Sequence, residues 1–190
     1  MTDSFAQNLI TLFETIHPLD QVPRAGFLLR GVANPESVAA HSHFVSLMTL
    51  LFVEQYPDRF DAKRALSMAL THDLAEAKLM DIPMPAADAY LKEAKHNAEQ
   101  SIMDDLLEPL PGKLAALHQE LENPQTEEAK LLRGLDKAQM MLKVMSYERE
   151  NRGDLEEFWN NPKNFADYGI EPVSKLFDAL CKKANRTRPQ

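Results

Sequence analysis

Residues 69–76 have the sequence Ala-Leu-Thr-His-Asp-Leu-Ala-Glu, an apolar helical segment that three ionisable residues interrupt. Burying His72, Asp73 and Glu76 without compensation would cost several kcal/mol each. A bound divalent cation is one such compensation, because imidazole nitrogen and carboxylate oxygen are its ordinary protein ligands. We expect one helix through the whole segment, with His72 and Asp73 about 100° apart and Glu76 one turn beyond His72. The segment therefore predicts a metal site inside a helical core.

Two further residues complete a candidate ligand set. His41 lies in the apolar part of a helix expected over 36–56, which could pack antiparallel to the helix that carries His72. Asp136 lies at the edge of the buried stripe of a helix expected over 126–150. Two histidines and two aspartates from three helices are enough for a mononuclear site.

The remaining histidines and the sulfur-containing residues have simpler interpretations. His43 is two residues from His41, a turn of about 200° on a helix, so it should point away from the site. We interpret His17 as a helix cap, and His96 and His118 as surface residues. Packing side chains rather than ligands are expected at four positions: Met140, Met141, Met145 and Cys181.

The rest of the chain has helical periodicity throughout. No segment alternates with period two for long enough to form a strand. We expect helices over 5–16, 36–56, 61–76 with Asp61 as its cap, 86–107, 113–121, 126–150, 155–159 and 172–184, and an ordered loop over 18–35. The sequence thus predicts one all-α domain, a helical bundle over 1–190 with the metal site in its core, a motif-bearing core over about 23–150 and C-terminal helices over about 155–184.

The composition excludes several classes of protein. The 21 basic and 29 acidic residues give a net charge of −8, which argues against a nucleic-acid or anionic-membrane partner. The longest apolar stretch, residues 44–53, is about half of the roughly 20 residues that a membrane-spanning helix needs. The single cysteine forms no internal disulfide, and the first residues show no secretory signal pattern. We therefore expect a cytoplasmic protein.

The order of these residues, His then His-Asp then Asp, resembles the signature of the HD superfamily of metal-dependent phosphohydrolases. Residues 24–41 are similar to the N-terminal block of the HD-domain 5′-deoxynucleotidases, and residues 70–76 with Asp81-Ile82 are similar to their second block. The resemblance continues in Lys95-His96, Glu128-Ala129-Lys130, Leu135-Asp136-Lys137-Ala138 and Ser146-Tyr147-Glu148. It covers residues 23–180, and three ordered blocks are far more specific than a lone His-Asp pair.

The resemblance implies a role for each matched residue. One divalent metal ion, which could be Mn, Co, Mg, Zn, Ni or Fe, would be held by His41, His72, Asp73 and Asp136. Glu76 would position or deprotonate the attacking water, and Asp81 would contact the substrate near the sugar.

The loop before the first histidine would also contact substrate. An Arg there would bind phosphate; both Arg24 and Arg30 are candidates, and Arg24 is preferred. Phe27 stands where relatives generally have a Trp that packs against deoxyribose, although it could be a core residue. Met80 stands where relatives often have Gly, and Ala40 where an acidic residue is common. These departures leave the ligand set intact and bear on substrate selectivity.

We therefore expect a hydrolase that releases phosphate from (deoxy)nucleoside 5′-monophosphates. One alternative is an HD phosphohydrolase of another small phosphate ester, which Phe27 and Met80 would allow. The other is a metal-binding regulatory module without turnover, and Glu76 beside an intact ligand set favours the enzymes over it. The expected partners are a small nucleotide substrate and a second copy of the chain in a homodimer, paired through an exposed apolar helix face.

Overall fold

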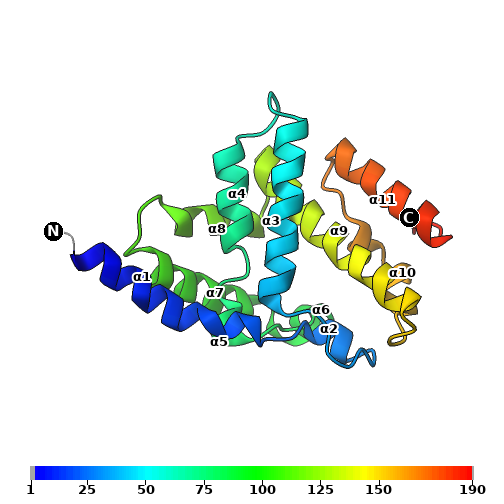
Figure 1. The fold of residues 1–190 in the computed structure, drawn as a ribbon, viewed down its shortest axis with the longest axis horizontal. Coiled ribbons are helices and arrows are strands. Elements are labelled where there is room, and N and C mark those ends of the chain that lie inside the picture. The colour runs from blue at the N-terminus through cyan, green and yellow to red at the C-terminus, as the bar shows by residue number, and fades with distance from the viewer. Residues whose placement is uncertain (1–2, 190) are drawn as a thin grey trace.

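The computed structural model describes residues 3–189, and within this range the chain contains helices and no strand (Figure 1). One isolated antiparallel bridge joins Pro23 to Ser37. The predicted all-α class is therefore confirmed.

The element bounds are as follows. The helices are α1 (Asp3–Ile16), α2 (Ala25–Leu28), α3 (Val38–Gln55), α4 (Ala62–Thr71), α5 (Glu76–Leu79), α6 (Met84–Ala86), α7 (Lys92–Leu107), α8 (Leu114–Glu122), α9 (Glu127–Arg149), α10 (Glu156–Asn160) and α11 (Glu171–Ala184). Two 3₁₀ segments, η1 (His17–Asp20) and η3 (Pro162–Phe165), and a π-helical segment, η2 (Ala87–Leu91), complete the series.

The longest helix, α9, lies at the centre of the molecule and packs against α3, α4, α8 and α11. In Figure 1 it runs between α3 and α11. Helices cover it on more than one side, and its buried residues in the main core cluster are Leu131, Leu135, Ala138, Met141, Val144, Met145 and Tyr147. The core thus forms around the helix that carries Asp136.

Three side-chain caps fix where the central helices begin. Ser37, Asp61 and Thr126 each accept a hydrogen bond from the backbone N–H three residues later. Such caps satisfy N–H groups that the first turn of a helix leaves unpaired. The starts of α3, α4 and α9 accordingly agree with the sequence pattern to within two residues.

The helix expected over 61–76 is wrong in its second half. α4 ends at Thr71, residues 72–75 form a turn, and α5 begins at Glu76. His72 and Asp73 therefore lie at a helix end, not within a continuous helix.

The physical reason is local hydrogen bonding at the end of α4. The Thr71 hydroxyl donates to the Ser67 carbonyl at 2.8 Å, and the His72 ring Nδ1 lies 2.8 Å from the Ala69 carbonyl. The backbone N–H of Leu74 then bonds to the Thr71 carbonyl, three residues back. The His72 ring thus takes the carbonyl that the backbone N–H of Asp73 would need in a continuing helix, and the three-residue bond tightens and ends the ladder. The Thr71 bond alone does not end a helix, since Thr49 and Ser146 make the same bond within α3 and α9.

The C-terminal part packs on the far side of α9. Trp159 is 3% exposed, its ring lies 6.1 Å from that of Phe165, and the Arg186 guanidinium sits 5.5 Å from its centroid. Arg188 pairs with Asp167 at 2.9 Å and donates to the Phe165 carbonyl at 2.8 Å. These contacts hold residues 186 and 188 against α10 and η3.

Several smaller predictions are also settled. Cys181, Met141 and Met145 are buried packing residues, and Met140 packs partly buried against the same core. The expected helix over 86–107 is divided into α6, η2 and α7. Among the described residues, no helix combines the length and apolarity needed to cross a membrane.

Candidate metal centre

Three of the four predicted ligands converge at the C-terminal end of α4. The Nε2 atoms of His41 and His72 are 3.5 Å apart, and Asp73 Oδ2 lies 3.2 Å from His72 Nε2 and 3.6 Å from His41 Nε2. Within residues 3–189, this trio has ligand atoms that all lie within 4.8 Å of one another. The break after Thr71 produces this arrangement, because the turn directs both His72 and Asp73 toward α3.

Asp136 reaches the cluster through His41 alone. Its Oδ1 lies 3.1 Å from His41 Nε2, and its Oδ2 lies 3.6 Å from Lys137 Nζ. It is not part of the trio that meets the mutual 4.8 Å spacing. Burial opposes its ionisation, but Lys137 and His41 hold the pKa of this carboxyl well below its usual value. Asp136 is thus an ionised carboxylate facing the cluster from α9.

The hydrogen bonds behind the two imidazoles show that the residues fit a cation. The His72 ring bonds to a carbonyl, which can only accept, so its Nδ1 carries the hydrogen and its Nε2 has a lone pair. His41 Nδ1 lies 2.6 Å from the Gln139 side-chain oxygen, also an acceptor. In their neutral forms, both rings therefore direct the lone pair of Nε2 toward the carboxylates, an arrangement that a cation between them would satisfy. Ligands bound at about 2.0–2.2 Å from one ion lie roughly 3–3.6 Å apart, as these atoms do.

The pKa shifts describe the same demand for positive charge. Burial opposes protonation of His72, yet Asp73 and Asp136 raise its pKa. Burial also opposes ionisation of Asp73, yet His72, His41 and Arg24 hold its pKa well below the usual value. The Asp73 Oδ2 atom is buried and has no hydrogen-bond donor. The cluster therefore stabilises cations.

Glu76 is the carboxyl with the opposite shift. Burial, together with the charges of Asp73 and Asp81, raises its pKa to about 10, and Arg24 and Lys95 oppose the rise. The residue is 6% exposed, and its Oε2 is buried without a hydrogen-bond donor. A carboxyl perturbed by burial and like charge in a cleft is typical of a catalytic acid or base.

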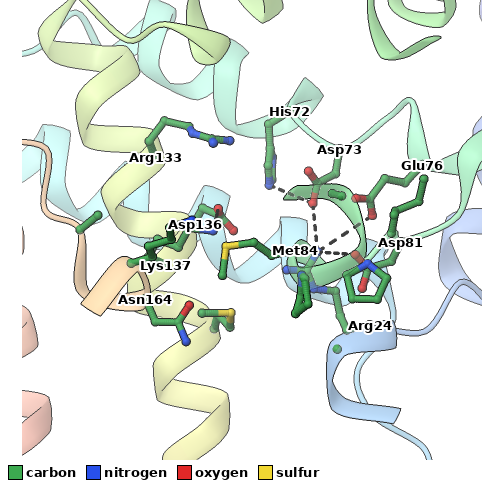
Figure 2. Close-up of a pocket in the computed structure, with 18 of the residues that line it drawn as sticks. Arg24, His72, Asp73, Glu76, Asp81, Met84, Arg133, Asp136, Lys137 and Asn164 are labelled. Atoms are coloured by element: carbon green, nitrogen blue, oxygen red, sulfur yellow. Dashed lines mark ion pairs between the residues drawn. The ribbon is translucent and has the colours of Figure 1, made fainter. Parts of the chain in front are cut away.

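A cavity of about 550 Å³ opens over the cluster, within the range of small-molecule sites. Figure 2 shows Arg24, Glu76 and Asp81 on one side of it and Arg133, Asp136 and Lys137 on the other, with His72 and Asp73 between them. His41 is fully buried and does not line the cavity. Three of the predicted ligands thus face the cavity and the fourth supports them from behind.

The segment over 18–35, expected as a loop, contains most of η1 and the short helix α2, and it brings the predicted substrate residues to this cavity. Arg24 NH1 lies 3.6 Å from both Asp73 and Asp81 and 4.0 Å from Glu76. Arg30 also lines the cavity, but its guanidinium is paired with Glu157, with an Nε–Oε2 distance of 2.7 Å. Of the two candidates, Arg24 lies beside the cluster.

Asp81 and Phe27 hold this segment in place. Asp81 Oδ2 accepts a 2.6 Å hydrogen bond from the Ala25 backbone N–H. Phe27 lines the cavity, yet it is 2% exposed, stacks on Phe158 and meets Tyr147 edge-on. Phe27 is therefore a core residue whose ring borders the cavity.

Sequence reasoning missed two residues at the site. Gln139 bonds to His41, and Arg133 lines the cavity with a buried Nε that has no acceptor among the described residues. Arg133 lies one turn before Asp136 on α9, and Gln139 one turn after it. The helical spacing from Asp136 was the signal that could have found both.

The interpretation of His118 as a surface residue is wrong. It is 5% exposed, lines the cavity, and has a pKa lowered by burial. It lies four residues after Leu114 and three before Leu121, on the face of α8 that packs inward. His43 and His96 are exposed, as predicted.

Comparison with known proteins gives a consistent result. Residues 16–170 match the model of the family described as HD domain. The 5′-deoxynucleotidase HDDC2 of Xenopus laevis is 34% identical over 96% of this chain and 90% of its own length. The human 5′-deoxynucleotidase HDDC2 is 32% identical over 82% of this chain and 77% of its own length.

Solved structures have the same fold. The PH0347 protein of Pyrococcus horikoshii has a TM-score of 0.75 at 32% identity, covering 92% of this chain and 97% of its own. A predicted metal-dependent phosphohydrolase from Magnetospirillum magnetotacticum has a TM-score of 0.71 at 22% identity over 96% of both chains, and shows the fold alone. From its ordered motifs, its helical fold and these matches, the chain belongs to the HD domain family.

Proposed function

We propose that this protein is a metal-dependent phosphomonoester hydrolase that releases phosphate from (deoxy)nucleoside 5′-monophosphates. The observation that carries the proposal is the His41-His72-Asp73 cluster at a 550 Å³ cavity, with Glu76 and Arg24 beside it. The relatives named 5′-deoxynucleotidase, at 32% and 34% identity over most of the chain, support the substrate class.

His41, His72, Asp73 and Asp136 would hold one divalent ion. A divalent ion bound there polarises a phosphoryl oxygen and lowers the pKa of bound water. The positions of His41 on α3 and of His72 and Asp73 at the end of α4 already bring three of these ligand atoms together, and Asp136 faces them from α9.

The positive charge of a divalent ion held beside Asp73 would offset the burial and like charge that raise the pKa of Glu76, so Glu76 would be ionised and would take the proton of the attacking water at its unpaired Oε2. The water oxygen would bond to phosphorus as the bond from phosphorus to the 5′ oxygen breaks, and that oxygen would leave with the proton that Glu76 took from the water. Arg24 would bind the phosphate oxygens with its guanidinium, which stays charged and can bind two oxygens at once. Asp81 would accept a hydrogen bond from a sugar hydroxyl, and the ring edge of Phe27 would contact the sugar.

A substrate panel tests the proposal. Phosphate release is measured from deoxyribo- and ribonucleoside 5′-monophosphates with Mn²⁺, Co²⁺ or Mg²⁺, and we expect turnover with the deoxyribonucleotides. Turnover of glycerol phosphate or sugar phosphates alone would establish the second candidate, a hydrolase of another small phosphate ester. The burial of the Phe27 ring favours keeping this candidate, because little of the ring is free to select a deoxyribose. Metal binding without any turnover would establish the regulatory module instead.

Replacing Glu76 separates catalysis from metal binding. The change Glu76→Gln should lower kcat by about 10²-fold or more, because an amide cannot accept the proton of water. Metal content, measured by elemental analysis, should be unchanged. Glu99→Gln is the matched control, since Glu99 lines the same cavity but is paired with Lys95 at 2.6 Å. Equal losses in the two variants would contradict the assignment.

We also propose that the protein is a cytoplasmic homodimer. Large apolar side chains are exposed on α1, with Phe13 65% exposed, and on α3, with Leu51 60% exposed. Such patches favour contact with a partner, here a second copy. Light scattering should give twice the 21.5 kDa mass of one chain. A variant that places a charge on the paired face, Phe13→Glu or Leu51→Glu, should have the mass of one chain. A wild-type mass of one chain would contradict the dimer, and cell fractionation tests the location.

A further inference from the structure

A chain of buried hydrogen bonds extends from the metal cluster into the core. His41 Nδ1 lies 2.6 Å from Gln139 Oε1, and Gln139 Nε2 donates to Glu36 Oε2 at 2.9 Å. His41, Gln139 and Glu36 are 0%, 2% and 9% exposed. No solvent competes for these bonds, so each partner sets the orientation of the next.

Glu36 is fixed from two sides. Its backbone N–H donates to the Tyr147 hydroxyl at 2.7 Å, and Lys143 Nζ lies 3.6 Å from its Oε2. Lys143 lies beside this side chain as its positive partner, and a carboxylate only accepts hydrogen bonds. Gln139 must therefore turn its NH₂ group toward Glu36 and its oxygen toward His41.

This orientation determines the tautomer of His41. A side-chain amide oxygen accepts and cannot donate, so the hydrogen of the neutral imidazole lies on Nδ1. The lone pair then lies on Nε2, the atom 3.5 Å from His72 Nε2 and 3.1 Å from Asp136 Oδ1. The carboxylate of Glu36 thus acts on the cluster through an amide.

We propose that Gln139 and Glu36 are positioning residues that hold His41 as its Nδ1–H tautomer and limit its strength as a metal ligand. The inference rests on the metal site of the proposed function. A carboxylate bonded directly to a ligating imidazole increases the basicity of the ligand. Here a neutral amide separates the two groups, so His41 receives the orientation but little of the negative charge. The consequence is a metal ion held less tightly than by a direct carboxylate–histidine pair, and hence an exchangeable one.

The first test examines the tautomer in the metal-free wild-type protein. Long-range ¹H–¹⁵N NMR at pH 8, with the His41 signals assigned by their loss in His41→Gln, should show hydrogen on Nδ1 only. Hydrogen on Nε2 would overturn the proposal. The measurement needs no variant of the hydrogen-bonded chain and no activity.

The second test moves the carboxylate from residue 36 to residue 139, so that it is bonded directly to His41. The double variant Gln139→Glu, Glu36→Gln keeps a donor and an acceptor at each contact but places the charge directly beside His41. It should bind Co²⁺ about 10-fold more tightly than the wild type, whereas Gln139→Met, which has no acceptor, should bind it about 10- to 100-fold more weakly. Calorimetric titration measures the affinities, and circular dichroism checks that each variant is folded.

The double variant should bind Co²⁺ more tightly and Gln139→Met more weakly, and these opposite changes in affinity distinguish positioning from a merely structural role. If both variants weaken binding alike, or neither changes it, the proposal is wrong. Because the titrations contain no nucleotide, they are independent of the substrate panel: the affinity order can hold in a protein that hydrolyses no nucleoside monophosphate, and turnover can be found without this order.

Discussion

At the level of single residues, Arg24 sets the charge balance of the cavity. One guanidinium lies within 4.0 Å of three carboxylates, those of Asp73, Glu76 and Asp81. Burial opposes its charge, but these carboxylates outweigh burial and raise its pKa above the usual value. It therefore remains a cation at every pH at which the protein is folded, available to a phosphate beside the cluster.

Arg24 and Arg30 form a matched pair for testing the phosphate contact. Arg24→Met should lower kcat/KM for a nucleoside monophosphate by about 10²-fold or more, as loss of a preorganised charge contact does. Arg30→Met removes a partly exposed pair with Glu157 and should change kcat/KM by less than about 3-fold. Steady-state kinetics of both variants shows which arginine binds the phosphate. A larger loss of kcat/KM in Arg30→Met than in Arg24→Met would assign the contact to Arg30.

Met80 has a backbone conformation that side chains rarely adopt. Its φ of 64° and ψ of 168° fall in a region that is almost exclusive to glycine. This is a physical reason for the Gly that the family resemblance implies at this position. The strain lies next to a residue that faces the cavity, where strain of about 1–3 kcal/mol is common.

Relieving that strain should stabilise the protein. Met80→Gly is expected to raise the free energy of unfolding by about 1 kcal/mol, because the relief exceeds the entropic cost of glycine and the side chain is 52% exposed. Lys78→Gly, in the ordinary helix α5, should instead lower it by about 1 kcal/mol. Urea denaturation measures both, and a loss on Met80→Gly would show that the position is not strained.

At the level of elements, the main difference from the sequence prediction is the turn at 72–75. The apolar spacing of α4 continues through Glu76, and the segment contains no Gly or Pro to mark an end. The helix ends where the His72 ring bonds to the Ala69 carbonyl, which the backbone N–H of Asp73 would need in a continuing helix. Periodicity reports which face is buried, but it does not report this competition for carbonyls. The residues of the site were therefore predictable, whereas their convergence at a helix end was not.

Gly153 joins two elements that the sequence does not link. With φ at +76°, it lies in the turn after α9, and a Cβ added there would lie 2.7 Å from the Arg30 carbonyl oxygen. The neighbouring Asp154 N–H donates to the same carbonyl at 2.8 Å. The turn after α9 thus supports the segment that carries Arg24 and Phe27.

Comparing Gly153 with Gly169 distinguishes the cost of a close contact from the cost of backbone strain. Gly169 has a φ of +79° but no atom within 4 Å of an added Cβ. Gly169→Ala should therefore lower the free energy of unfolding by about 1 kcal/mol, through strain alone, and Gly153→Ala by about 2 kcal/mol or more, through strain and overlap. Equal losses in urea denaturation would mean that the close approach to Arg30 does not matter.

At the scale of the whole molecule, the proposed metal ion would join distant parts of the chain. His41 lies on α3, His72 and Asp73 follow α4, and Asp136 lies on α9. The sequence predicted that these helices meet, since each carries polar residues in an apolar stripe. The packing of α11 and α10 around Trp159 could not be predicted, because short amphipathic helices do not specify which face of the core they cover.

Metal should therefore stabilise the fold. At 100 times its dissociation constant, an ion bound only by the folded state adds about 2.7 kcal/mol, which raises Tm by roughly 5–10 °C for a chain of this size. Calorimetry with Mn²⁺ or Co²⁺, and then with a chelator, measures the shift. His41→Gln should abolish it, whereas His43→Gln, two residues away and exposed, should retain it. A shift that survives His41→Gln would place the ion elsewhere.

Trp159, the one tryptophan of the sequence, lies in α10 and is 3% exposed. Its fluorescence therefore reports how the C-terminal elements pack against α9, while Trp159 itself is neither a proposed ligand nor a residue of the cavity lining. If added metal shifts the fluorescence midpoint as much as the loss of helical ellipticity, residues from α3 to α11 unfold as one cooperative unit. Two separate midpoints would instead divide the predicted single domain into a metal-responsive core and an independently melting C-terminal layer.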